Sequence, residues 1–158
     1  MNRYSIYIQR EGETAAVNSV EEWNVAVTSI CADTDGGFRD FTSREWADED
    51  GEDVYIPTTP RLKAFDAKWK VCYKGNADTA YETLEAMREK LTGALLDIYD
   101  TYSSHGYAGC YLKEFSDPTY TRNGDEDVLQ FSITFRVTKP RTKVILTQSN
   151  GVNTLTEN

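Results

Sequence analysis

The sequence predicts a mainly β protein, an antiparallel β-sandwich or barrel with one flanking α-helix (α+β) at about residues 76–92. Two segments alternate apolar and polar residues with the period of two that half-buried strands show. Ten tyrosines and three tryptophans also favour sheets, where aromatic residues pack well. Only one segment has a convincing helical period, so the sequence lacks the strand–helix–strand rhythm of a doubly wound sheet.

The two alternating segments are the strongest predicted strands. The apolar face of the first strand carries Ala67, Trp69, Val71 and Tyr73. Its opposite face carries the basic stripe, defined as Lys68, Lys70 and Lys74. The apolar face of the second strand carries Leu129, Phe131, Ile133, Phe135 and Val137. Weaker strands are predicted at residues 4–9, 23–31, 95–99, 107–115 and 142–147. Asn123-Gly124 predicts a hairpin turn before the second strong strand.

The predicted helix has one apolar stripe at steps of three and four residues. The stripe contains Ala77, Ala80, Tyr81, Leu84, Met87 and Leu91. Thr79 and Glu82 match a capping box, or Asn76 caps the helix one turn earlier. Gly93 stands where a left-handed residue ends a helix.

The domain organisation follows from composition. Residues 1–147 are expected to form a single domain, and the polar residues 148–158 a flexible C-terminal tail. Residues 32–60 form a long acidic connection, and loops of this length in compact domains are usually functional or disordered. The connection also carries four aromatic residues: Phe38, Phe41, Trp46 and Tyr55.

The charge and cysteine content argue against several classes of protein and kinds of site. A net charge of −9 argues against a general nucleic-acid binder and against an anionic membrane surface. No apolar run approaches the length of a membrane span, and the first residues lack the apolar core of a signal peptide. Cys31, Cys72 and Cys110 are too widely spaced for a zinc site or disulfide framework, which predicts reduced thiols in a cytosolic protein.

The stretch SREWADEDGEDVYIP, residues 43–57, holds six carboxylates around one glycine. As an EF-hand loop with Gly51 at its sixth position, it would place Trp46 and Pro57 at two ligand positions, and neither coordinates calcium. No metal or cofactor is therefore predicted.

Catalytic arrangements are poorly supported. His105 is the only histidine, and its setting YSSHGYAG indicates a turn. No G-x-S-x-G elbow or phosphate-binding glycine loop is present. The acids crowd into two turns, at residues 45–53 and 125–127, rather than flanking a substrate as a catalytic pair does.

Four runs within residues 41–146 have a recognisable pattern: FTSREWADEDGEDVYIP, LKAFDAKWKVCYKGNADTAYETLEAMREKLTG, LLDIYDTYSSHGYAGCYLKEFSD and DVLQFSITFRVTKPRTKVIL. They resemble small tail proteins of phages and prophages of Bacteroides-like bacteria. More broadly, they resemble the tube-like domain shared by tail tube and distal tail proteins. The shared features are an acidic loop entering a strand, a strand before an amphipathic helix, and a final F-x-I-x-F strand.

The resemblance implies a non-enzymatic structural protein of the virion, made and assembled in the bacterial cytoplasm. It implies a tube-like domain at residues 1–147 that forms a six-fold ring of copies of itself and also contacts other tail proteins. The distal tail, tail tube and tail terminator roles all stay open. DNA would pass through the lumen without specific binding.

The acidic loop is the predicted ring interface. Its proposed contact residues are Trp46, Asp48, Glu49, Asp50, Glu52, Asp53 and Tyr55. Their basic partner is either the basic stripe or the group Lys139, Arg141 and Lys143. The alternative function is a carbohydrate-binding or glycoside-cleaving β-sandwich that uses exposed Trp and Tyr side chains beside paired carboxylates.

Overall fold

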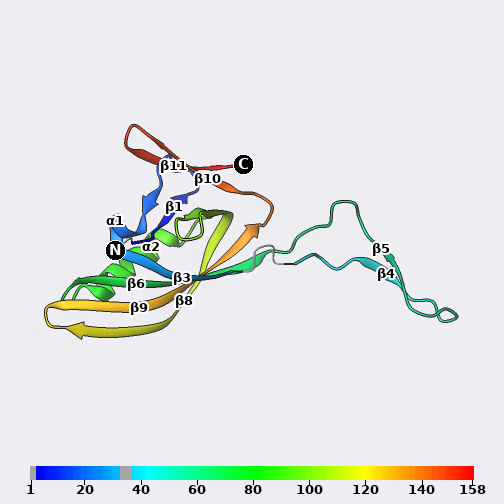
Figure 1. Ribbon diagram of the computed structural model, residues 1–158, viewed down its shortest axis with the longest axis horizontal. Coiled ribbons are helices and arrows are strands. Elements are labelled where there is room, and N and C mark those ends of the chain that lie inside the picture. Colours follow the sequence, from blue (N-terminus) through cyan, green and yellow to red (C-terminus); the bar gives the residue numbers. More distant parts are fainter. Residues whose placement is uncertain (1–2, 33–36) are drawn as a thin grey trace.

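A computed structural model describes residues 3–32 and 37–158 (Figure 1). Its elements in chain order are β1 (Ile6–Arg10), β2 (Val17–Asn18), α1 (Ser19–Trp23), β3 (Val25–Ala32), β4 (Thr42–Arg44), β5 (Asp53–Tyr55), β6 (Phe65–Asn76), α2 (Ala80–Leu91), β7 (Leu96–Asp100), β8 (His105–Asn123), β9 (Glu126–Lys139), β10 (Val144–Ser149) and β11 (Val152–Glu157). The predicted mainly β, antiparallel fold with a flanking helix is confirmed.

Seven strands form one curled antiparallel sheet in the order β2-β1-β7-β8-β9-β6-β3. The sheet bends until its last strand reaches the chain just before β1, where Val27 N donates to Tyr4 O at 2.9 Å. Buried Ser19 ties the same edges, because its Oγ accepts from Ile6 N at 3.0 Å and donates to Val25 O at 2.9 Å. The main sheet is therefore close to a closed barrel.

The two strongest predicted strands form the centre of the core. β6 pairs with β9 along its whole length, with Trp69 opposite Ile133. Every apolar position predicted to face inward on these strands is buried. Trp69 is fully enclosed, with Tyr107 and Phe135 packed edge-on at ring distances of 5.5 and 5.6 Å. Its indole N–H has no acceptor among the described residues.

Helix α2 starts later than expected, and the predicted capping box is wrong. Thr79 makes no side-chain cap bond, because its hydroxyl contacts Tyr73 Oη at 2.7 Å and the Asn76 carbonyl. Asp127 of β9 caps the helix instead, since its Oδ2 accepts from Thr79 N at 3.1 Å and from Ala80 N at 3.3 Å. Tyr120 donates to the other carboxylate oxygen at 2.6 Å, which is the main reason that the pKa of Asp127 is lowered.

The C-terminal end of the helix matches the prediction, whereas its apolar stripe does so only in part. Gly93 does adopt a left-handed conformation after the helix, with φ of +86°. Tyr81 leaves the predicted apolar stripe and is exposed, whereas Met87 and Leu91 are buried against the sheet.

A second, short helix was missed by the helical-period criterion. α1 contains only five residues, too few to show a period of 3.6. Its signal is Asn18, whose Oδ1 accepts from Val20 N and Glu21 N at 2.9 and 3.2 Å. Such an N-cap is typical of a helix start.

The expected flexible tail at residues 148–158 is wrong for residues 152–157, which form β11 of a C-terminal hairpin. Asn150 and Gly151 both have positive φ, 51° and 77°, and this is the type I′ turn that an Asn-Gly pair favours. The hairpin packs on the outer side of the sheet through a small second core of Val144, Leu155 and Ala108. Single-domain organisation of residues 1–147 stays a prediction.

Candidate assembly surface

The connection between β3 and β6 projects from the body as an arm, defined here as residues 37–62 (Figure 1). At its root, Arg39 N donates to Arg61 O at 2.7 Å, and Phe38 bridges Leu62. Toward its tip, β4 pairs with β5 in antiparallel register. The predicted loop therefore contains a hairpin rather than an irregular chain. Residues 33–36 of that prediction lie outside the described residues.

The arm has no core of its own. From residue 37 to residue 56 every side chain is exposed, including Tyr55 at 70% and Ile56 at 66%. The other large exposed apolar side chains of the arm are Phe38, Phe41, Trp46 and Val54. An isolated two-stranded hairpin is marginally stable in water. An arm of this kind is expected to gain order and bury apolar area when it contacts a partner.

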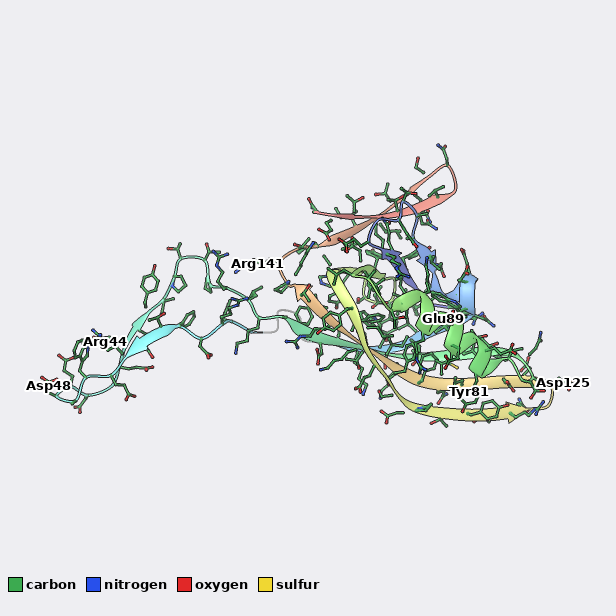
Figure 2. All side chains as sticks on the ribbon, turned by 180° about the vertical axis from the view of Figure 1, so that it is seen from behind. Arg44, Asp48, Tyr81, Glu89, Asp125 and Arg141 are labelled. Carbon is green, nitrogen blue, oxygen red and sulfur yellow. The ribbon has the colours of Figure 1, made fainter. Side chains whose placement is uncertain are left out.

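The structure brings together part of the predicted interface at the tip of the arm. Trp46 Nε1 donates to Asp53 Oδ2 at 3.1 Å, and the Arg44 guanidinium lies 4.6 Å from the Trp46 ring centroid. The other tip acids make no ion pair within the described part of the chain, and Figure 2 shows Asp48 at the far end of the arm. The tip thus carries six carboxylates, one of them bonded to the indole, which makes it a strongly anionic surface.

The basic stripe lies far from that tip, on the outward face of β6 in the body. Two of its lysines already have acidic neighbours: Lys68 Nζ is 3.8 Å from Asp117, and Lys74 Nζ is 3.4 Å from Glu126. In the second predicted basic group, Lys139 pairs with Glu157 at 3.1 Å, and Arg141 donates to the Pro60 carbonyl at the arm root. Neither group meets the acidic tip within one chain.

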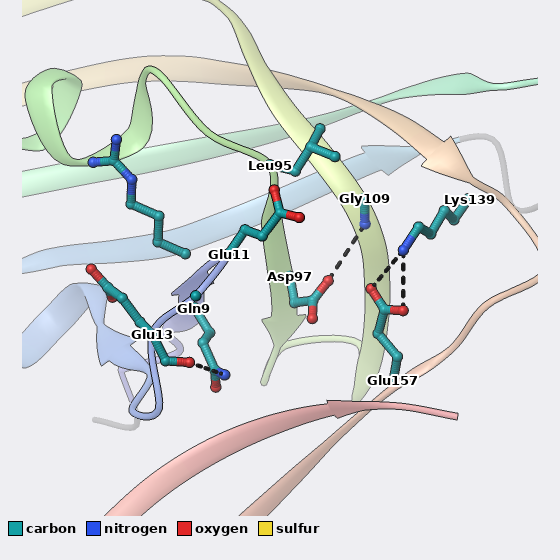
Figure 3. A pocket seen from close by; sticks show the side chains of 10 residues that line it. Gln9, Glu11, Glu13, Leu95, Asp97, Gly109, Lys139 and Glu157 are labelled. Carbon is teal, nitrogen blue, oxygen red and sulfur yellow. Dashed lines mark hydrogen bonds and ion pairs between the residues drawn. The ribbon is translucent and has the colours of Figure 1, made fainter.

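A carboxylate pair that no sequence motif indicates lies under the C-terminal hairpin. Asp97 of β7 and Glu157 of β11 line a cavity of about 180 Å³, with Gly109 N 3.5 Å from Asp97 and Lys139 paired to Glu157 (Figure 3). Burial, followed by the charge of and hydrogen bonding with Glu157, raises the pKa of Asp97 to about 6. Only the docking of β11 brings the two acids together, since they are sixty residues apart in the chain.

This pair predicts a pH dependence of stability. Because the folded-state pKa of Asp97 is above its ordinary value of 3.8, its contribution to stability is full below pH 4 and is lost as pH rises through 6. Asp97→Asn should therefore gain stability relative to wild type between pH 4.5 and pH 7, by about 1 kcal/mol after allowance for solvent screening. Urea unfolding at the two pH values measures the difference.

Asp66 supplies a control, because its pKa is shifted in the opposite direction to that of Asp97. Hydrogen bonds from Lys113 and Arg136, at 2.7 and 3.0 Å, lower the pKa of Asp66. Its contribution to stability is present at neutral pH and is lost on acidification. Asp66→Asn should thus be less stable than wild type by a nearly constant amount between pH 4.5 and pH 7, and the difference should shrink only as the pH falls below 3.8. If the free energy of unfolding depends on pH in the same way for Asp97→Asn and for the wild type, the predicted pH dependence does not come from the Asp97–Glu157 pair.

The other side chains that could have catalytic or metal-binding roles are His105 and the cysteines. His105 lies edge-on to Tyr107, with ring centroids 4.7 Å apart. Cys72 and Cys110 are free thiols whose pKa values are raised by burial, and the side chain of Cys31 is outside the described residues. Within residues 3–32 and 37–158, no three His, Cys, Asp or Glu side chains are grouped to hold a metal ion. No helix there is long and apolar enough to cross a membrane.

No protein-family model matches the chain, and the search of curated proteins gives no match. Solved structures do match, and one of them is the SPP1 Dit (gp 19.1) protein. The fold resembles that of this phage Dit protein. The TM-score is 0.56 at 15% sequence identity, over 90% of this chain and 54% of the Dit chain. The chain thus spans about half the length of Dit, which is described as a paradigm of the hub adsorption apparatus in phages that infect Gram-positive bacteria.

Proposed function

We propose that the chain is a non-enzymatic structural component of a phage or prophage tail that assembles into rings through its arm and sheet edges. The observation that carries this proposal is the arm, an exposed hairpin with apolar and acidic side chains and no core. The likeness of the body to SPP1 Dit supports a distal tail role before a tail tube or terminator role. The relation to tail proteins of Bacteroides-type phages stays a prediction from sequence.

A ring needs a heterologous interface, in which one surface of a subunit meets a different surface of the next. A projecting arm on one side of a compact body supplies the asymmetry that such contacts require. Six copies per ring, contacts with other tail proteins and a lumen for passing DNA follow from the resemblance to tube-like tail domains. The protein would act in the virion after assembly in the bacterial cytoplasm.

The alternative, a carbohydrate-binding or glycoside-cleaving protein, is less well supported. The tip carboxylates lie on a projecting hairpin and do not flank a pocket. The Asp97–Glu157 pair does line a cavity, but Glu157 is already ion-paired with Lys139 at 3.1 Å and is not free to act on a substrate. No aromatic side chain lines that cavity to stack on a sugar.

Trp46→Ala tests the proposed role of the arm. We expect association at high protein concentration to weaken by about tenfold or more, since interfacial tryptophans often contribute 2 kcal/mol or more to binding. Light scattering after size exclusion, supported by negative-stain images, measures the assembled mass. The variant should keep the thermal melting temperature of the wild type because Trp46 is outside the core.

The matched control is Tyr111→Ala, which removes an aromatic side chain of similar exposure from the body, 43% against 45% for Trp46. Unchanged association of the control together with weakened association of Trp46→Ala supports assembly through the arm. Unchanged association of Trp46→Ala contradicts the anchor role of this residue. A wild type that is monomeric at every concentration contradicts ring assembly by this chain alone.

A further inference from the structure

The root of the arm and the end of β9 together enclose a hollow of about 420 Å³. This root hollow is lined by four cationic side chains, Arg39 and Arg61 from the arm and Lys139 and Arg141 from the body. Leu62 and Pro140 add apolar surface. Sequence reasoning noted Lys139 and Arg141 but missed both arm arginines, because only the pairing of Arg39 with Arg61 across the root places them beside β9.

Most of the positive charge in the root hollow has no acidic partner among the residues that the structure describes. Within the described residues, Arg39, Arg61 and Arg141 make no ion pair, and only Lys139 has one, with Glu157. Like charges gathered around one hollow repel one another, so an anion that enters it is favoured. Guanidinium groups bind carboxylates in bidentate geometry, which adds specificity for acidic side chains.

The complementary surface is on the same arm but at its other end. The tip carries Glu45, Asp48, Glu49, Asp50, Glu52 and Asp53, of which only Asp53 has a side-chain partner among the described residues. Figure 2 shows Asp48 at the far end of the arm and Arg141 near its root. Tip and root hollow therefore do not meet within one copy. The tip and the hollow can meet each other only between copies.

We propose that the root hollow is the receptor for the acidic arm tip of a neighbouring copy. The proposal rests on the proposed ring assembly and names the site on the body that the arm engages. Each copy supplies one tip and one hollow, so the same contact repeats from copy to copy, and it forms a ring when the rotation between successive copies closes. Trp46 enters with the tip, where its ring can face the arginine guanidinium groups.

The basic stripe is the competing receptor on this chain. It has less free charge than the root hollow, because Lys68 and Lys74 already lie beside Asp117 and Glu126. The charge pattern therefore favours the root hollow, where three arginines make no ion pair in the described part of the chain.

Charge reversal on either side of the contact tests the proposal. One variant reverses the hollow (Arg39→Glu, Arg61→Glu and Arg141→Glu), which leaves Lys139 as its only cation. These three arginines make no ion pair among the described residues. The other reverses the tip (Glu45→Lys, Asp48→Lys, Glu49→Lys, Asp50→Lys and Glu52→Lys) and keeps Asp53, the hydrogen-bond partner of Trp46. Each variant alone should associate about a hundredfold more weakly than the wild type, as measured by sedimentation velocity at low salt. Thermal melts should show both variants folded.

Mixing the two variants gives the deciding result. In an alternating assembly every tip faces a hollow of opposite charge, so the equimolar mixture should associate within about tenfold of the wild type. The matched control, Lys70→Glu with Lys74→Glu, reverses two charges of the basic stripe and should associate like the wild type.

The contrary outcomes separate this inference from the proposed function. If the mixture does not recover association, or if reversal of the basic stripe weakens it and reversal of the hollow does not, the root hollow is not the receptor and ring assembly still stands. If the wild type is monomeric throughout the concentration range, both proposals are overturned.

Discussion

Replacing residues 40–60 with a Gly-Ser-Gly linker is expected to give a folded body that no longer assembles. The linker can close the gap because Arg39 and Arg61 are already hydrogen-bonded neighbours across the arm root. The removed residues contribute almost nothing to the core. A shorter connection also has a slightly smaller entropic cost of closure. The free energy of unfolding should therefore change by less than about 1 kcal/mol. Chemical denaturation and sedimentation measure stability and mass on the same sample.

A shortened chain that forms the same assemblies as the wild type would show that sheet edges alone drive association. A shortened chain that is unfolded would show instead that the arm is part of the folding unit. The full-length chain, measured at the same concentration and salt, is the reference for both comparisons.

Trp69→Ala should destabilise the protein by about 3–5 kcal/mol, the range found when a buried aromatic side chain is truncated to alanine. Trp69 is 0% exposed and packs against Tyr107 and Phe135 from neighbouring strands. No other side chain can fill its volume without moving the strands. For a chain of 158 residues the melting temperature should fall by roughly 10 °C. Thermal unfolding followed by circular dichroism measures the shift.

Two variants control this prediction. Trp46→Ala removes an exposed indole and should leave the melting temperature unchanged. Trp69→Phe keeps an aromatic ring and removes an N–H that has no acceptor among the described residues, so it should cost much less than alanine. A small effect of Trp69→Ala would mean that the centre of the sheet is less tightly packed than the structure indicates.

The strands were the most predictable part of the fold. In β6 and β9 apolar and polar residues alternate in the sequence, since one face of each strand packs in the core. The second face of β9 is also covered at Ser132 and Thr134, both of which are buried. β8 was predicted too short, at residues 107–115 instead of His105–Asn123, because its second half is exposed on both faces and shows no apolar alternation. Exposed strands carry little pattern, since neither face selects for apolar residues.

Helix capping shows the limit of local reasoning. Thr79 and Glu82 have the spacing of a capping box, yet Asp127 caps α2 from almost fifty residues away. A local sequence motif competes with any side chain that the sheet places at the same helix end. Here Asp127 is buried, and it satisfies two backbone donors and the Tyr120 hydroxyl together.

The sequence by itself determined the fold class, the two central strands and the existence of an acidic, aromatic connection at residues 32–60, because hydrophobic period and composition are local properties of the chain. Only the tertiary structure decided which charges become neighbours. It placed Arg39 and Arg61 beside Lys139 and Arg141, and it joined Asp97 to Glu157 through the docked β11. The physical reason is that strand pairing joins residues distant in sequence, and electrostatic energy depends on their separation in space.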